Sequence, residues 1–489
     1  MFAVHSVRDR MKPRGSAVLV TQGMPTTPTE AVIVPDKAAS LSRRQFLRLA
    51  GLSATSLASA GLVSCVPAPS ATAPASQAGP SKQPGEKAQL VYQDWRTDWF
   101  PPMAQSMLGQ FHETHPNIRV FYTLDPENLA DKMLSDFQAG TAPDVFDGCC
   151  DFFPIWGQKG HTLDLRSYVA ADLDRATVED WDPAQYKALF TRDGRQYGLP
   201  KYHGALALFF NKDLFDEAKL PYPDGSWNHD DYLLAMRRLT LDRDANDQAD
   251  VWGSMFDISW ERIQVHVNEW GGHFVDPEDP ARSMMADPPA LAAMEWLRAR
   301  MWDDRVMPSP LDVQKRGTRQ AFVDRQLAMV EDGSWALRDI LVGAGFRIGV
   351  APFPAGPERR ATLATTDGFG IYAGTKYPDA AWELLKFLVG KEYGRAMAKA
   401  HFLQPARSSL VEDWVGYIRG EFPGKTKDMD IAAFADGHRK GYSVVAEIFA
   451  RQDDAKRIAT DAWNQVLTLG QAPIDQMRIA SQEIDKAQG

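Results

Sequence analysis

The chain has 489 residues, with 54 Lys and Arg against 64 Asp and Glu, and a formal net charge of −10 at pH 7. This acidic excess excludes a nucleic acid as the principal partner, because phosphate backbones are held by Lys and Arg. It also disfavours a strongly anionic ligand, unless one local basic pocket offsets it. Three cysteines are too few for a disulfide framework. The globular part, about 400 residues, is too long for one simple core, so two lobes are expected.

The stretch LSRRQFLRLAGLSATSLASAGLVSC, residues 41–65, predicts an export signal. Arg43 and Arg44 precede Gln-Phe-Leu, as in the twin-arginine export motif. The run ends in Leu-Val-Ser-Cys, which resembles a lipobox in which Cys65 is acylated. The apolar run 49–64 is too short and too rich in serine to cross a membrane, which takes about 20 apolar residues. A secretion signal is therefore favoured over a membrane span.

The segments around this motif do not have the pattern of a folded domain. Residues 1–64 are the predicted leader and signal, and the true start within 1–40 stays open. Residues 65–87 hold Cys65 and a stretch of Pro, Ala, Ser, Gly and Gln that favours a flexible tether. The mature protein is thus expected to be lipid-anchored and extracytoplasmic, in the periplasm or at the outer face of the cytoplasmic membrane.

Strand and helix patterns alternate directly after the tether. Short apolar runs typical of strands lie at 88–95, 117–124 and 143–148, and helical spacing of apolar residues lies between them at 103–115 and 127–140. Such a series predicts a parallel sheet with helices on its faces, which is an α/β fold.

Acidic and aromatic residues follow two of these strands. Asp94, Trp95 and Trp99 come with the end of the first strand, and Asp147 and Asp151 with the end of the third. Because ligands of parallel sheets bind at the carboxyl ends of the strands, these five residues are candidate ligand contacts.

Helical patterns dominate the middle of the chain, for example at 231–240 and 288–304. A strand at 368–374 and a helix at 377–390 are predicted near the end. No nucleophile-elbow, P-loop or dinucleotide-binding string stands between a strand and a helix, so the protein is predicted not to be an enzyme.

Several stretches in order resemble one protein family, with three departures: Phe210 stands where Tyr is usual, Ser226 where Thr is usual, and Arg325-Gln326 where Gly-Lys is common. The stretches are GTAPDVF at 140–146, GRQYGLPKYHGALALFFNKDLFDEA at 194–218 followed by Ser226-Trp227, AFVDRQLAMVEDGSW at 321–335, and VAPFPAGPERRATLATTDGFGIYAGTKYPDAAWELLKFL at 350–388. The set resembles bacterial extracellular solute-binding family 1, the sugar-binding proteins of ABC importers.

The resemblance implies a two-lobed, periplasmic-binding-protein-like α/β fold with hinge strands and a ligand cleft between the lobes. By analogy, lobe one comprises 88–203 plus 354–402, and lobe two comprises 204–353 plus 403–486. The implied protein is a monomer that captures a mono- or oligosaccharide by hinge closure and delivers it to the subunits of an ABC permease. The sequence does not name the sugar.

A neutral sugar is held by carboxylates and amides at its rim and by aromatic faces beneath it. Family motifs and hinge positions add to the strand-end candidates Tyr202, His203, Trp270, Asp332, Ser334, Trp335, Asp367 and Phe369.

Three alternatives stay open. The ligand is another polar solute, such as a glycerol-phosphate, if the cleft contains Arg or Lys. The protein is a secreted carbohydrate-active enzyme if two carboxylates flank a scissile bond. It feeds a membrane sensor if no permease reads the closed form.

The stretch LDRDANDQADVWG, residues 241–253, resembles a calcium loop, but Asp247 stands at the position of the loop glycine and Gly253 at that of the bidentate glutamate. A polar turn is therefore favoured, with a calcium ion at 242–250 as the alternative. No other metal or cofactor is predicted. Whether Cys149 and Cys150 form a disulfide stays open.

Overall fold

The computed structural model describes residues 87–149 and 151–489, which belong to one compact unit. The twin-arginine motif at Arg43 and Arg44, the lipidation residue Cys65, the tether and Cys150 lie outside the described residues. The predictions for them, including the disulfide question, stay predictions.

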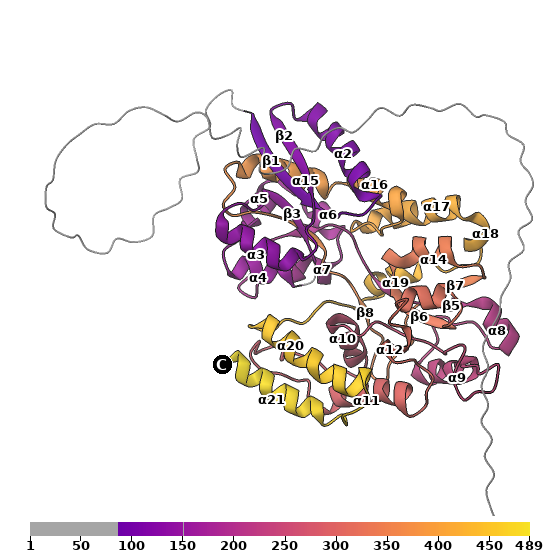
Figure 1. The fold of residues 1–489 in the computed structure, drawn as a ribbon. Coiled ribbons are helices and arrows are strands. Elements are labelled where there is room, and N and C mark those ends of the chain that lie inside the picture. The colour runs from indigo at the N-terminus through magenta and orange to yellow at the C-terminus, as the bar shows by residue number, and fades with distance from the viewer. Residues whose placement is uncertain (1–86, 150) are drawn as a thin grey trace, which may run out of the picture. The chain divides into compact units, whose positions relative to one another are not determined.

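The first lobe is built on a five-stranded sheet in the order β2-β1-β3-β9-β4. Figure 1 labels three of its strands, β1, β2 and β3. β1 (Ala88–Asp94) pairs in parallel with β2 (Ile118–Leu124) and with β3 (Val145–Gly148), as the alternating patterns predict. β9 (Gly368–Ile371) pairs antiparallel with β3 and with β4 (Leu199–Pro200). The sheet is therefore mixed, because β9, which returns from the other lobe, runs opposite to the other four strands.

Helices cover both faces of this sheet. Successive residues of β3 point to opposite faces, so Val145 packs with Phe111 and Leu385 while Phe146 packs with Phe137 and Trp156. The helices of this lobe are α2 (Phe100–Thr114), α3 (Leu129–Ala139), α4 (Phe152–Gln158), α5 (Arg166–Asp172), α6 (Arg175–Glu179), α7 (Pro183–Ala188), α15 (Pro378–Leu388) and α16 (Lys391–His401).

The second lobe contains a three-stranded antiparallel sheet in the order β6-β5-β7. Its central strand β5 (Leu206–Asn211) is buried on both faces and pairs with β6 (Met329–Gly333) and β7 (Ile348–Ala351). Phe210 faces one hydrophobic core of this lobe and Phe209 faces the other.

Most of the second lobe is helical, as its sequence pattern predicts. A short parallel pair, β8 (Thr362–Leu363) and β10 (Ser443–Val444), lies at its edge. The helices are α8 (Lys212–Ala218), α9 (His229–Leu239), α10 (Trp260–Glu269), α11 (Pro288–Trp302), α12 (Pro310–Val313), α13 (Thr318–Val323), α14 (Leu337–Gly343), α17 (Val411–Glu421), α18 (Pro423–Thr426), α19 (Ala433–Lys440), α20 (Gln452–Trp463) and α21 (Gln476–Gln488), with short turns at Ser334–Ala336 (η1), Ser408–Leu410 (η2) and Asn464–Thr468 (η3).

Local sequence explains why β5 stops where α8 starts. The Asn211 side chain accepts hydrogen bonds from the backbone N–H groups of Asp213 and Leu214, at 3.0 and 3.3 Å. Asparagine is among the best residues for capping a helix N-terminus in this way. The Asn-Lys-Asp string that resembles the family motif is thus a strand-to-helix junction.

Three chain segments cross between the lobes side by side. The backbone N–H of His203 donates to the Gln404 carbonyl at 2.9 Å, and that of Thr365 donates to the Gly204 carbonyl at 2.8 Å. These hydrogen bonds hold the crossings together as a hinge.

The segment 354–363 contacts lobe two, although the sequence assigned it to lobe one. Ala355 forms a bridge with Asn228, and Ala361 and Leu363 pack with Val265 of α10. The second crossing in chain order lies next to Ala364, where the chain turns toward β9.

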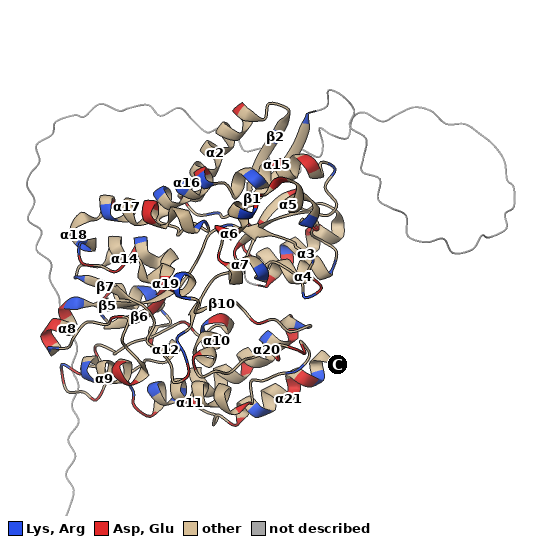
Figure 2. Ribbon diagram, turned by 180° about the vertical axis from the view of Figure 1, so that it is seen from behind, with Lys and Arg blue, Asp and Glu red and all other residues tan. Residues whose placement is uncertain are grey.

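Lys and Arg are interspersed with Asp and Glu along outer helices such as α17 and α21 (Figure 2). Within residues 87–149 and 151–489, no helix is both long and apolar enough to pass through a membrane.

Candidate functional site

A cavity of about 250 Å³ is lined by residues of both lobes. Lobe one and the hinge supply Tyr202 and Asp367, and lobe two supplies Trp335 with the first turn of α10. The remaining lining residues are Cys149, Ser259, Glu261, Arg262, Leu363, Ala364, Thr365, Thr366 and Ala446.

Trp335 contacts both lobes at this cavity. It packs against cores of both lobes and against the small cluster around Leu206 and Val265. A methyl group on Gly333 would lie 2.3 Å from the Trp335 ring, and one on Gly204 would lie 2.9 Å from it. The Gly-Ser-Trp string therefore needs its glycine because the tryptophan ring lies directly over that backbone.

The first turn of α10 places polar side chains opposite Trp335. The Ser259 hydroxyl accepts a hydrogen bond from the backbone N–H of Arg262 at 3.4 Å and so begins the helix. Arg262 lies with its guanidinium carbon 6.0 Å from the centre of the Trp335 ring. Sequence reasoning missed Ser259, Glu261 and Arg262. A serine before an acidic helical turn was the available signal.

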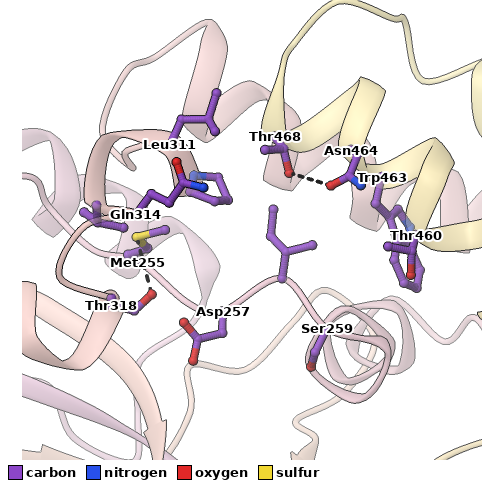
Figure 3. A pocket seen from close by; sticks show the side chains of 14 residues that line it. Met255, Asp257, Ser259, Leu311, Gln314, Thr318, Thr460, Trp463, Asn464 and Thr468 are labelled. Carbon is purple, nitrogen blue, oxygen red and sulfur yellow. Dashed lines mark hydrogen bonds between the residues drawn. The ribbon is translucent and has the colours of Figure 1, made fainter.

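Two further cavities adjoin the first. One, of about 370 Å³, shares Ser259 with it and lies between α12–α13 and α20, with Trp463 and Asn464 on one side and Gln314 and Thr318 on the other (Figure 3). The other, of about 630 Å³, shares Asp257 with the second and is lined by polar side chains, Asp332 among them. The predicted residue Asp332 thus lies in the wall of the third cavity.

Asp332 is held by two arginines. Its carboxylate accepts hydrogen bonds from Arg262 at 3.1 Å and from Arg319 at 2.9 Å. Burial alone would raise the pKa of Asp332, but the two guanidinium groups outweigh burial and lower it. Asp332 is therefore ionised and orients both arginines at the cleft.

Asp367 has the opposite electrostatic environment. Burial raises its pKa to about 6, and Lys201 only partly offsets that rise. A carboxyl with this pKa can serve as an acceptor or a donor toward a hydroxyl group near neutral pH.

The predicted strand-end residues Asp94 and Asp147 do come together, but on a lysine that the sequence did not single out. Lys201 donates to Asp94 and, at 2.9 Å, to Asp147, and all three side chains are almost completely buried. Asp147 lies within β3 rather than after it. The sequence offered no signal for Lys201, because its two partners lie 107 and 54 residues away along the chain.

The carboxyls of this trio have raised pKa values. Burial, the Asp147 charge and the partly compensating Lys201 bring the pKa of Asp94 to about 7. Burial and Asp125 do the same for Asp147 against the effect of Lys201, also to about 7. Asp94, Asp147 and Lys201 thus form a buried polar cluster, and none of the three lines the cavity.

Trp95 and Trp99 lie next to that cluster. The Lys201 ammonium is 3.5 Å from the centre of the Trp95 ring, which packs edge-on against Tyr202 at 5.3 Å. Trp99 stacks on His401 of α16, with ring centres 4.8 Å apart. Trp95 thus reaches the cavity only through Tyr202.

Asp151 joins the two lobes. Its carboxylate forms an ion pair with Lys456 of α20 at 2.7 Å, and Lys456 also lies 3.8 Å from Glu261. The predicted residue is therefore a lobe-to-lobe contact beside the cavity.

Three other predicted residues are elsewhere. Ser334 accepts a hydrogen bond from the Ala205 backbone at 3.4 Å, and Phe369 is completely buried in the core of lobe one. The Trp270 ring packs at 4.6 Å from His229 and at 5.8 Å from Trp296, and Trp270 is not among the residues described as lining the cavity.

His203 lies at the hinge. Its Nε2 is 3.4 Å from the Asp182 carboxylate, which also accepts from His438 of α19 and from the first N–H groups of α7. Burial would raise the pKa of Asp182, but the bonds from His203 and His438 lower it far below its usual range.

Replacing Asp182 with asparagine keeps a side chain that can cap α7 but removes the carboxylate charge that faces His203 and His438, so it is expected to cost about 1.5–3 kcal/mol of unfolding free energy at neutral pH, the usual contribution of hydrogen bonds to a charged group. A lowered carboxyl pKa contributes stability that is present above the unfolded pKa, about 3.9, and is lost as the pH falls. Urea unfolding at pH 7 and pH 3 should therefore show a smaller acid-induced loss for Asp182→Asn than for the parent protein. An equal loss in both would contradict this role of Asp182.

The calcium-like loop is an exposed polar turn. Carboxylate oxygens of Asp242, Asp244 and Asp250 lie within 4.8 Å of one another. Backbone N–H groups of Asn246 and Asp247 donate to Asp242 at 3.2 and 2.9 Å, which accounts for the turn without an ion. Calcium at this loop stays the untested alternative to a polar turn.

The chain matches a known protein family. The model of the family described as "Bacterial extracellular solute-binding protein" matches residues 94–395. The chain is 22% identical over 407 residues to the diacetylchitobiose binding protein DasA of Streptomyces coelicolor, which covers 80% of this chain and 86% of that protein.

Solved structures share the fold. The ABC substrate-binding protein Lmo0181 from Listeria monocytogenes, solved in complex with cycloalternan, aligns with a TM-score of 0.70 and 22% identity over 82% of this chain and 99% of that one. UgpB from Mycobacterium tuberculosis, solved in complex with glycerophosphocholine, aligns with a TM-score of 0.67 and 17% identity over 82% of this chain and 98% of that one. The two-lobed α/β fold predicted from the sequence is confirmed.

Proposed function

This chain belongs to the family of bacterial extracellular solute-binding proteins, and we propose that it captures a carbohydrate in the interlobe cavity and delivers it to an ABC permease. The observation that carries the proposal is the cavity lined by both lobes, with Trp335 and Tyr202 as aromatic surfaces and Asp367 and Glu261 as hydrogen-bonding carboxyls. Apolar faces combined with convergent polar groups suit a sugar.

Hinge closure is the proposed mechanism. A ligand that contacts Tyr202 and Trp335 together gains its full binding energy only when the lobes are close, so it shifts the equilibrium toward the closed form. The ion pair between Asp151 and Lys456 favours the same arrangement. The permease then reads the closed shape.

One observation favours a second ligand class. Arg262 lines the cavity and Arg319 the third cavity, which meets the requirement for a phosphate-bearing solute such as a glycerol-phosphate. The likeness to UgpB points the same way. Both arginines already bind Asp332, so we rank the neutral sugar first.

A thermal-shift screen of the purified protein against mono- and oligosaccharides and against glycerol-phosphates tests the proposal. A site-specific ligand at 100 times its Kd stabilises the protein by about 2.7 kcal/mol, which such a screen detects. A sugar that raises the Tm supports the proposal, while a shift by a glycerol-phosphate alone selects the second candidate. Turnover of any glycan would establish an enzyme instead.

We propose that a lipid on Cys65 holds the protein at the membrane. Replacing Cys65 with serine is then expected to move the protein from the membrane fraction to the soluble fraction without changing ligand affinity, since the binding lobes begin after the tether. The matched control Cys149→Ser should remain in the membrane fraction. Membrane retention of the Cys65→Ser protein would refute the anchor.

A further inference from the structure

A buried group of two histidines and one glutamate in lobe two, away from the cleft, has the composition of a metal site. We propose that His229, His266 and Glu269 bind one zinc ion. His266 and Glu269 are three residues apart on α10, and His229 is the first residue of α9 (Figure 1). One ligand atom from each lies within 4.8 Å of the others. The proposal does not depend on what the cleft binds.

The distances suit zinc. His229 Nε2 lies 3.0 Å and His266 Nδ1 lies 3.4 Å from the same oxygen, Glu269 Oε2. Zinc binds imidazole nitrogen and carboxylate oxygen at about 2.0–2.2 Å, so ligand atoms at two corners of its tetrahedron are about 3.3 Å apart. Imidazole donors also select zinc-type ions over calcium or magnesium, which take oxygen ligands.

A second carboxylate orients His266 for this role. His266 Nε2 lies 2.9 Å from Glu331 Oε2, and the other oxygen of Glu331 accepts from Tyr232 at 3.0 Å. A metal-binding histidine characteristically donates its other ring N–H to a carboxylate, which fixes the tautomer and raises its basicity. With the proton on Nε2, the lone pair of His266 Nδ1 points toward Glu269.

A buried ring nitrogen that zinc would not bind, His229 Nδ1, lacks a hydrogen-bond partner among the described residues, and so do two atoms that zinc could bind. They are His266 Nδ1 and Glu269 Oε1, on side chains that are 1% and 0% exposed. Buried polar atoms without a partner are rare and costly. Zinc would satisfy both atoms, because a bidentate Glu269 adds the fourth donor to the two imidazole nitrogens.

Charge and surroundings agree with a closed, structural ion. The cluster holds two carboxylates, Glu269 and Glu331, whose charges one divalent cation balances. The ring centres of Trp270 and Trp296 each lie 4.6 Å from that of His229. The ring centre of Phe256 lies 5.2 Å from that of His266. An apolar shell of this kind excludes water and strengthens the metal–ligand interactions.

A protonated His266 is the rival explanation. Burial disfavours the imidazolium, but Glu331 and Glu269 raise the pKa of His266 to about 10. A protonated cluster requires no metal, and a zinc-loaded cluster releases protons as it binds. Metal content therefore separates the two explanations directly.

The zinc content of the full chain tests the proposal. The protein is unfolded, freed of metal with a chelator, and refolded with ZnCl₂, because the buried site needs an open path for loading. We expect one zinc per chain, and with CoCl₂ the visible absorption bands of a four-coordinate cobalt–imidazole site. Glu269→Gln should bind neither metal, and Glu331→Gln should lower zinc affinity by about 10- to 100-fold.

Two control variants locate the ion. His273→Gln removes a histidine that pairs with Glu447 in the same lobe, at 2.7 Å, and Asp250→Asn removes a carboxylate of the exposed loop. Both should keep one zinc. Parent protein that refolds without zinc, or zinc that Asp250→Asn removes, would overturn the proposal. If Glu269→Gln does not fold, the cobalt spectrum of the parent protein decides alone.

Discussion

Replacing Trp335 with alanine is expected to weaken the binding of the carbohydrate found by the screen by about 30-fold or more, corresponding to about 2 kcal/mol for an aromatic contact at the centre of a binding site. The ring lines the cavity and packs against cores of both lobes. Its loss therefore removes the ligand's apolar surface and one contact between the lobes. Isothermal titration calorimetry at a temperature well below the Tm measures the affinity.

Trp252→Ala is the matched control. Trp252 is also a partly buried tryptophan against the same core of lobe two, but it does not line the cavity. It should lower the Tm while leaving the affinity unchanged. If Trp335→Ala and Trp252→Ala both retain full affinity, Trp335 does not contribute to ligand binding.

Replacing Lys201 with methionine is expected to destabilise the protein by about 3–5 kcal/mol, the usual cost of removing one partner from a buried ion pair. Lys201 is completely buried between Asp94 and Asp147, and three aromatic rings surround its ammonium. Without it, two neighbouring carboxylates would share a site that excludes water. Urea unfolding measures the difference.

The pH dependence of this loss has a defined sign. The pKa values of Asp94 and Asp147 are already raised to about 7, and removal of Lys201 raises them further. Protonated carboxyls need no cation, so the destabilisation by Lys201→Met should shrink at acid pH and grow at alkaline pH. The triple variant with Asp94→Asn and Asp147→Asn should recover most of the stability. A constant loss from acid to alkaline pH would contradict this explanation.

The alternating strands and helices of lobe one are predictable because short-range sequence patterns define them. The apolar spacing of α3 and its terminal Gly140, at φ 67°, lie within one segment of chain. Gly390 shows where such reasoning fails. It was expected to end α15, yet it precedes α16, because the next helix begins at Lys391 and one short junction serves both helices.

The role of the strand-end aspartates depends on Lys201, a partner from a distant part of the chain. Their position at the carboxyl ends of strands favoured ligand contact, but Lys201 arrives from a segment more than fifty residues away and neutralises them. Trp270 was similarly expected in the cleft and instead packs beside Trp296 of α11. Spacing along the chain carries no information about such encounters.

The amino-acid sequence by itself determined the α/β class, the order of the family's motifs and the candidates Tyr202, Trp335 and Asp367, because these depend on local periodicity and on short strings of residues. Only the tertiary structure shows that Arg262 faces Trp335, that Lys201 forms ion pairs with two aspartates, and that His229 hydrogen-bonds to Glu269. The physical reason is that each of these groups gains its partner only through folding, which brings distant segments of the chain together, as in the hydrogen bond between His229 of α9 and Glu269 of α10.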